Sequence, residues 1–149
     1  AANSSSISDG AAVLLLMTRE NAANLGLAVL ATIKGHSTHS QEPAMFTTAP
    51  VGAMNKLLGK VDWTKDDVDL FEINEAFAMV TMLAISELGL DANKVNVNGG
   101  ACALGHPIGC SGARLLVTLI HALKARGLHR GVASLCIGGG EAVAMAIEV

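Results

Sequence analysis

Aromatic residues are scarce in this chain of 149 residues. It has no tyrosine, one tryptophan and three phenylalanines, so aromatics make up 3% of the sequence, whereas hydrophobic residues as a whole make up 51%. The core must therefore be built from alanine, valine, leucine, isoleucine and methionine. A chain of this length can bury a sizeable core without disulfides or metal staples, and we expect a single compact α/β domain.

Charge is also sparse, and it is not concentrated. Charged residues make up 15% of the sequence and the net charge is -3. Lysine and arginine are scattered along the chain, which argues against a nucleic-acid-binding surface. A small ligand that carries phosphate is compatible with this composition.

Cysteines are few and irregularly spaced. The three are Cys102, Cys110 and Cys136, an odd number without a CxxC pair or a histidine-rich cluster. This pattern favours neither a zinc site nor a disulfide framework, so we expect no metal and a reducing, cytoplasmic location.

Long apolar runs and a recognisable leader are also missing. The apolar runs are too short for a membrane span, and the first residues lack the pattern of a signal peptide. The chain starts at Ala1 rather than at methionine, and its first ten residues read as the interior of a loop. We therefore expect it to begin partway through a larger protein.

The apolar runs and glycine positions predict strands that alternate with helices. Strands are expected at 11–17, 28–33, 67–73, 131–137 and 141–149, and helices at 18–26, 52–61, 76–88 and 111–126. The segment 34–50 has no clean period and is interpreted as a strand tail and a loop. Alternating elements that close in a hairpin imply a mixed sheet with helices on its faces.

One histidine stands in a glycine-lined turn ahead of a long apolar helix. His106 lies between Gly105 and Pro107, and the proline restricts it to extended geometry, so it projects from a turn. The N–H groups at the start of the helix favour negative charge, as a site that forms an oxyanion requires. A turn histidine without a function is the alternative. Cys102 and Cys110, on either side, are interpreted as small packing residues.

Cys136 ends an apolar strand and runs into three glycines, Gly138 to Gly140. Strand ends are the usual location of binding crevices in open α/β folds. A cysteine in an apolar strand is more often an inert core residue. Consecutive glycines, however, are costly in entropy and indicate that a ligand or another backbone comes close. A thiol and an imidazole presented by glycine-rich backbone favour an acyl-transfer enzyme, and we expect them to converge on one pocket.

Asn74 and Glu75 follow a predicted strand and precede a buried helix. Helix capping explains both, since asparagine is a common cap and a glutamate in the first turn suits the helix dipole. The functional interpretation is that Asn74 holds a water or a ligand at the strand end. A nucleotide-binding module is disfavoured, because the glycine-rich turn lacks both the Gly-Lys-Ser/Thr ending and the GxGxxG spacing.

These residues resemble the thiolase family. Its blocks occur in order at 74–77, 98–114 and 136–140, and the opening residues 3–12 resemble the start of the family's second half. The resemblance implies that residues 1–149 form the carboxy-terminal domain of a thiolase, an α/β domain with a five-stranded mixed sheet and helices on both faces. It also implies an amino-terminal domain, absent here, that carries the cysteine nucleophile.

The resemblance further implies roles for individual residues. Cys136 matches the acid/base that takes a proton from the methyl carbon of acetyl-CoA, and His106 matches the residue that activates the nucleophile and holds the enolate oxygen. Asn74 matches the residue that positions a water in that oxyanion hole. The backbone N–H of Gly138 matches a donor in a second oxyanion hole.

The activity implied by the resemblance is the reversible condensation of two acetyl-CoA to acetoacetyl-CoA and free CoA. CoA thioesters are then substrates and there is no resident cofactor, with Ser5 and Phe77 against the pantetheine arm. This chain alone would be inactive, and homo-oligomers are expected by analogy. One alternative is a 3-ketoacyl-CoA thiolase of fatty-acid β-oxidation, and another is a non-catalytic thiolase-like lipid-binding module. The presence of Cys136, His106 and Asn74 together disfavours the second.

Overall fold

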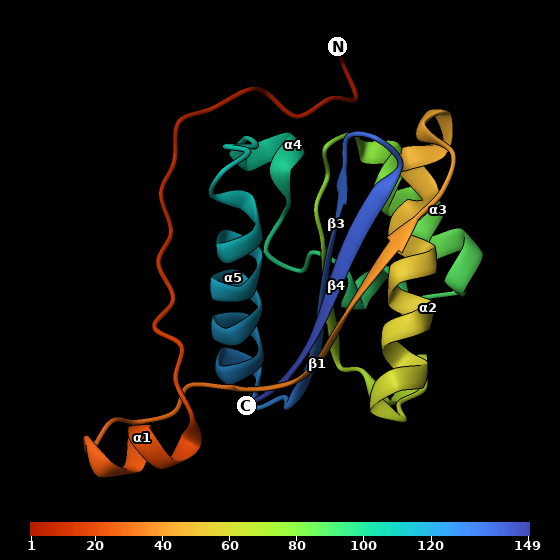
Figure 1. Cartoon of the computed structure of the whole chain (residues 1–149). Helices are drawn as coiled ribbons and strands as arrows, with labels where there is room; N and C mark the ends of the chain where they lie inside the picture. Colours follow the sequence, from red (N-terminus) through yellow and green to blue (C-terminus); the bar gives the residue numbers. More distant parts are fainter.

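The computed structural model describes all 149 residues, and it is built around a four-stranded mixed sheet (Figure 1). The strands are β1 (Thr32–Ser40), β2 (Leu70–Ile73), β3 (Arg130–Ile137) and β4 (Glu141–Glu148), in the order β1-β4-β3-β2. β4 is antiparallel to β1 and to β3, whereas β2 is parallel to β3. β1, β2 and β3 therefore run in one direction, and their carboxyl ends form one edge, the carboxyl edge, which lies uppermost in Figure 1.

Helices cover both faces of the sheet. α2 (Ala49–Val61) and α3 (Ala78–Leu88) pack on one face, and α5 (Ser111–Arg126) packs on the other. The shorter helices are α1 (Arg19–Asn24), α4 (Ala101–Leu104), η1 (Pro43–Thr48), η2 (Lys65–Asp67) and η3 (Ala92–Lys94). None of these helices combines the length and the apolar character that crossing a membrane would need.

The core is aliphatic, as the composition predicts. Alternate residues of each strand face opposite sides, so Phe71 and Ile73 of β2 pack with α2 and α3, whereas Leu70 packs with α5. α5 presents an apolar stripe to the sheet, because Leu115, Leu119 and Leu123 recur every four residues and are at most 1% exposed.

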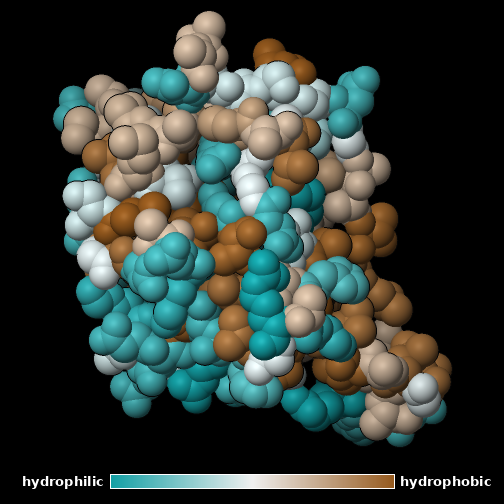
Figure 2. Space-filling view, turned by 180° about the vertical axis from the view of Figure 1, so that it is seen from behind, coloured by the Kyte–Doolittle hydropathy of each residue, from teal (hydrophilic) through white to brown (hydrophobic).

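The predicted sheet has one strand too many. Residues 11–17 pair with no strand and run along the outside of the molecule to α1 (Figure 1). Val13, Leu15 and Leu16 are between 69% and 87% exposed. Seen from behind, the lobe at the lower right of Figure 2, which contains α1, is largely apolar. The sequence supplies strand composition here, but a strand forms only where a partner backbone accepts and donates its hydrogen bonds.

The other predicted elements are present, most of them with shifted bounds. The strand expected at 28–33 is β1, which begins at Thr32 and continues to Ser40 through a segment that was interpreted as a strand tail and loop. The helices expected at 52–61 and 76–88 are α2, which begins at Ala49, and α3, which begins at Ala78. The helix at 111–126 has the predicted bounds.

Candidate active site

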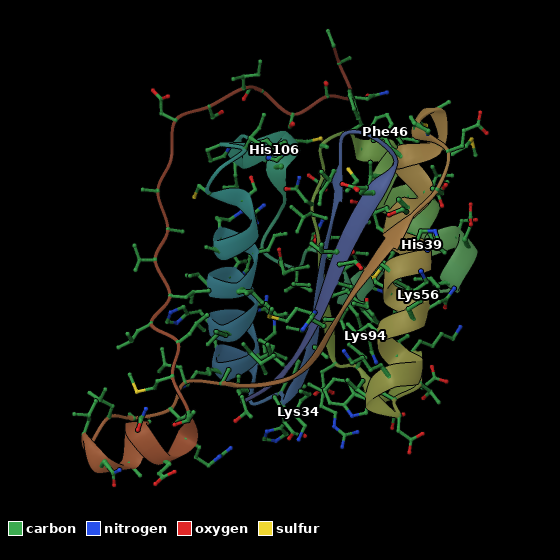
Figure 3. The ribbon with its side chains drawn as sticks, in the orientation of Figure 1. Lys34, His39, Phe46, Lys56, Lys94 and His106 are labelled. Carbon is green, nitrogen blue, oxygen red and sulfur yellow. The ribbon has the colours of Figure 1, made fainter.

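His106 lies in the turn between α4 and α5, at the carboxyl edge (Figure 3). Gly105 precedes it with a φ of +93°, which favours glycine, and a Cβ at this position would overlap the Ser8 hydroxyl. The backbone N–H of His106 donates to the Ser6 carbonyl oxygen at 2.9 Å. The glycine turn and the amino-terminal segment therefore fix the backbone that presents the imidazole, as predicted for a turn histidine.

The hydrogen bonds of His106 define its tautomer. Its Nδ1 lies 2.5 Å from the Ser111 hydroxyl oxygen, and that hydroxyl donates to the Pro107 carbonyl oxygen at 3.1 Å. The Arg114 guanidinium, which can only donate, faces the side-chain oxygen of Asn74, so the Asn74 nitrogen faces Nε2; Nε2 therefore accepts, and the proton of the neutral ring is on Nδ1 and is donated to Ser111. Burial, and then the positive charge of Arg114, lower the pKa of His106, so the neutral ring is favoured at pH 7.

Asn74 follows β2 and is completely buried. The capping interpretation is wrong, because α3 begins at Ala78 with Phe77 as its N-cap residue. Instead, the Asn74 side-chain nitrogen lies 3.4 Å from His106 Nε2, and its oxygen accepts a hydrogen bond from Arg114 at 3.3 Å. Two residues that are 32 positions apart in the sequence therefore meet at one edge of the sheet.

Cys136 lies near the end of β3 at the same edge and is 9% exposed. It belongs to the core cluster on the α2 and α3 side, whereas the side chains of His106 and Asn74 contact α5. Both ring nitrogens of His106 have other partners, so no hydrogen bond joins the thiol to the imidazole. Burial raises the pKa of Cys136, which keeps the thiol protonated. The convergence of thiol and imidazole on one pocket stays a prediction.

The glycines after Cys136 form the turn between β3 and β4, and they differ in what surrounds them. Gly139 and Gly140 have φ values of +99° and +90°, and a Cβ on Gly140 would overlap the Gln41 carbonyl oxygen. For Gly140, the predicted close approach of another backbone is confirmed. Gly138 has no positive φ, and a Cβ there would meet open space. Gly138 therefore has free space where a side chain would stand, unlike Gly140.

Ser5 and Phe77, the two candidate substrate-binding residues, lie side by side. The Ser5 N–H and hydroxyl both donate to the Ala76 carbonyl oxygen, at 3.2 and 3.0 Å. Phe77 is 40% exposed, and its ring meets Phe46 edge-on with 6.1 Å between the centroids. The start of the chain therefore lies across the beginning of α3, where the family resemblance predicts that the pantetheine arm of CoA binds.

Sequence reasoning gave no role to two charged residues behind Asn74. Glu72 is 1% exposed in the middle of β2, and Arg114 reaches it from α5, with Nη1 of the arginine 3.5 Å from Oε2 of the glutamate. Burial raises the pKa of Glu72 to about 7, although the charge of Arg114 opposes the shift. The available signal was a carboxylate within an apolar strand, on the same alternating face as Asn74.

Glu75 is not in the first turn of α3, and its side chain instead holds the start of α4. Its carboxylate accepts a hydrogen bond from the Cys102 backbone N–H at 3.0 Å, and a Cβ on Gly100 would overlap it. Cys110 is buried, as expected of a packing residue, but the interpretation of Cys102 as a packing residue is wrong, because Cys102 is exposed. All three cysteines are free thiols.

The groups at the carboxyl edge suit proton transfer and the binding of a negative oxygen. A neutral imidazole with its lone pair on Nε2 can accept a proton, and a buried thiol can give one. Amide N–H groups can donate to an oxyanion. No group of three or more His, Cys, Asp or Glu side chains could hold a metal ion. Two cavities of about 340 Å³ each lie elsewhere, and neither is lined by His106, Asn74 or Cys136.

The chain matches known proteins over nearly its whole length. The family model described as "Thiolase, C-terminal domain" matches residues 27–149. The acetyl-CoA acetyltransferase of Chromobacterium violaceum is 53% identical over 148 residues, which are 99% of this chain and 38% of the relative. This chain thus spans well under half the length of the curated relatives it matches.

Solved structures give the same result. The acetyl-CoA acetyltransferase of Bacillus anthracis superimposes with a TM-score of 0.96 at 53% identity, over 98% of this chain and 37% of that one. A human mitochondrial 3-ketoacyl-CoA thiolase, solved in complex with CoA, gives a TM-score of 0.86 at 40% identity, over 88% of this chain and 33% of that one. The fold and the sequence therefore point to one family.

Proposed function

This chain belongs to the thiolase family, and from that premise we propose that it supplies the carboxy-terminal catalytic half of an acetyl-CoA acetyltransferase. The reaction is the reversible condensation of two acetyl-CoA to acetoacetyl-CoA and CoA. The observation that carries the proposal is the contact between Asn74 and His106 at the carboxyl edge, in a chain 53% identical to an acetyl-CoA acetyltransferase.

In the proposed chemistry, Cys136 removes and returns the proton of the methyl carbon of acetyl-CoA. In condensation, the thiolate takes that proton, and the resulting enolate attacks the acetyl group carried by a nucleophile outside this chain; as the new carbon–carbon bond forms, the bond between the acetyl group and that nucleophile breaks and the nucleophile leaves. In thiolysis, the thiol returns the proton to the departing carbon. Burial raises the pKa of Cys136, which supports the proton-donating direction at rest.

The thioester proton is much less acidic than a thiol, so the enolate oxygen needs donors as it forms. In the proposal, the side chains of His106 and Asn74 serve this oxygen: Nε2 of His106 donates to it after taking up the proton of the nucleophile, and the Asn74 amide holds a water that donates to it. Loss of one such donor costs about 2.7 to 4 kcal/mol of barrier in other enzymes. The Gly138 N–H is proposed to serve the tetrahedral intermediate, which its open surroundings support.

The acyl group is proposed to be short. The acetyl-CoA acetyltransferases are 53% identical to this chain, whereas the 3-ketoacyl-CoA thiolase is 40% identical. The CoA complex of that thiolase supports CoA thioesters as the substrate class, and three free thiols support a reducing compartment such as the cytoplasm. Association with copies of itself and with an amino-terminal domain belongs to the same proposal.

The test uses a chimera in which this chain follows the part of the Chromobacterium violaceum relative that precedes the matched region. We expect the chimera to cleave acetoacetyl-CoA with CoA. Cys136→Ala is expected to lower kcat at least 100-fold, in the range typical of a lost acid/base. Cys102→Ala is the matched control, because this exposed thiol has no part in the proposal, and its kcat should stay within twofold. Equal activity of the two variants would remove Cys136 from the mechanism.

A further inference from the structure

A buried charged pair lies directly behind Asn74. Glu72 is 1% exposed, the Arg114 side chain is 18% exposed, and their closest atoms are 3.5 Å apart. Neither carboxylate oxygen of Glu72 has a hydrogen-bond partner, and neither does Nη1 of Arg114. A long buried ion pair of this kind is a poor source of stability, since apolar residues of similar volume often serve as well or better. Its presence calls for another reason.

The pair is connected to the candidate site through one guanidinium group. Leu70, Glu72 and Asn74 lie on the same alternating face of the β2 segment, towards α5. Arg114, near the start of α5, directs Nη1 to Glu72 and Nη2 to the side-chain oxygen of Asn74. The planar guanidinium can make both contacts at once, which the single ammonium of a lysine cannot do in the same geometry.

The guanidinium also decides which way the Asn74 amide faces. A side-chain amide can turn by 180°, which exchanges its oxygen and its nitrogen. Arg114 has only donors, so the oxygen of Asn74 must face it, and the nitrogen faces His106 Nε2 at 3.4 Å. In this orientation the amide donates to the lone pair of Nε2, and the ring proton of His106 lies on Nδ1, which donates to the Ser111 hydroxyl oxygen.

We propose that Glu72 and Arg114 are positioning residues, which hold the Asn74 amide with its N–H groups towards His106 and the reacting oxygen. Glu72 anchors the guanidinium and balances its charge beside the imidazole. The effect of this positioning on catalysis rests on the proposed function, whereas the orientation of Asn74 and the protonation state of His106 do not. Neither residue touches the substrate.

The test compares three variants in the chimera described above: Glu72→Gln, Arg114→Met and the double variant. Arg126→Met is the matched control, an arginine of the same helix that bonds to Ala122 and Asn98 instead. We expect each single variant to lower kcat for thiolysis 10- to 100-fold while KM stays within twofold. The control should keep the activity of the parent chimera.

The double variant separates positioning from stability. Arg114→Met leaves the Glu72 carboxylate buried and unpaired, so this single variant should unfold at a lower urea concentration than the parent at pH 8. Removing both charges should restore the unfolding midpoint but not kcat, because nothing then orients Asn74. Recovery of kcat together with the midpoint would show a purely structural pair and overturn the proposal. So would single variants that keep kcat within twofold.

The imidazole NMR signals of His106, assigned with a His106→Asn variant, give a readout that needs no activity. Arg114 on α5 is the charged group that acts on this ring, and Glu72 and Glu75 lie on the β2 side. Arg114→Met should raise the pKa of His106, because it removes a positive charge that lowers it, whereas Glu72→Gln should change it little, because Glu72 is mostly protonated at the pH where the ring titrates. Unmoved signals in Arg114→Met overturn the positioning proposal. An inactive parent chimera overturns only the proposed function, and the NMR result still decides the positioning.

Discussion

At the scale of single residues, the site depends on a few side chains whose partners leave them one orientation. Arg114 offers only donors and so faces the side-chain oxygen of Asn74, and the amide nitrogen that then faces His106 needs an acceptor at Nε2. These two restrictions together fix the amide of Asn74 and the tautomer of His106. The sequence alone shows the residues but not these restrictions, since they arise between β2, the turn and α5.

Glu72 should make the stability of the fold depend on pH. Its pKa rises from 4.5 to about 7 on folding because burial disfavours the charged form. Between these two values the folded state binds more protons than the unfolded state, so the stability from this group is present below pH 4.5 and is lost as the pH rises through 7. Between pH 5 and pH 8 the loss amounts to about 2–3 kcal/mol.

The measurement is urea unfolding of the parent chain and of Glu72→Gln at pH 5 and pH 8. Glutamine does not titrate, so the variant should gain about 2–3 kcal/mol relative to the parent between the two pH values. Comparing the two proteins at each pH cancels the contribution of His106, whose lowered pKa acts with the opposite sign. A difference that is the same at both pH values would mean that Glu72 is charged throughout.

At the scale of elements, the sequence predicts periodic and apolar segments well. α5 has its predicted bounds because its polar residues recur at helical spacing and Gly127 ends it with a φ of +64°. β3 and β4 lie within one residue of their predicted bounds, because apolar strands flank a glycine turn. β1 was less well predicted, since its later half, with the polar residues Ser37 to Ser40, lacks an apolar signal.

The candidate site was predicted residue by residue, and its arrangement was predicted mainly through the family resemblance, which places His106 and Asn74 at one oxyanion hole. His106 and Asn74 meet, whereas the pairing of either with Cys136 stays a prediction. Asn74 was weighed as a helix cap because the start of α3 was expected at Ala76, and the observed start at Ala78 removes that role. Glu72 and Arg114 were missed because their connection is made only when α5 packs on β2.

The turn between β3 and β4 gives a test of what its glycines do. Gly140→Ala places a Cβ at a φ of +90° and against the Gln41 carbonyl oxygen, so we expect a loss of about 2 kcal/mol or more in the free energy of unfolding. Gly138→Ala is the matched control, since its Cβ meets open space at an ordinary φ. Urea unfolding measures both. A Gly138→Ala variant as unstable as Gly140→Ala would contradict this account.

At the scale of the whole molecule, the apolar surface is unevenly distributed. The two cores lie on either side of the sheet, yet Val13, Leu15 and Leu16 are exposed along the segment that leads to α1 (Figure 1). The family model begins at residue 27 and so leaves this segment out. The fold therefore consists of a sheet domain with a buried core on each face of its sheet and a leading segment, residues 11–17, that contributes little apolar burial.

Substitutions at two leucines, one in each part, test this difference by experiment. Leu15 is 76% exposed and Leu119 is completely buried between α5 and the sheet. Leu119→Ala should cost about 2–5 kcal/mol, because it removes buried methyl groups and leaves a cavity. Leu15→Ala should leave the free energy of unfolding unchanged to within about 0.5 kcal/mol, as for a surface substitution. Both are measured by urea unfolding of the 149-residue chain. A large loss for Leu15→Ala would mean that the leading segment packs on the sheet domain in solution, and that the exposed apolar surface in Figure 2 is covered.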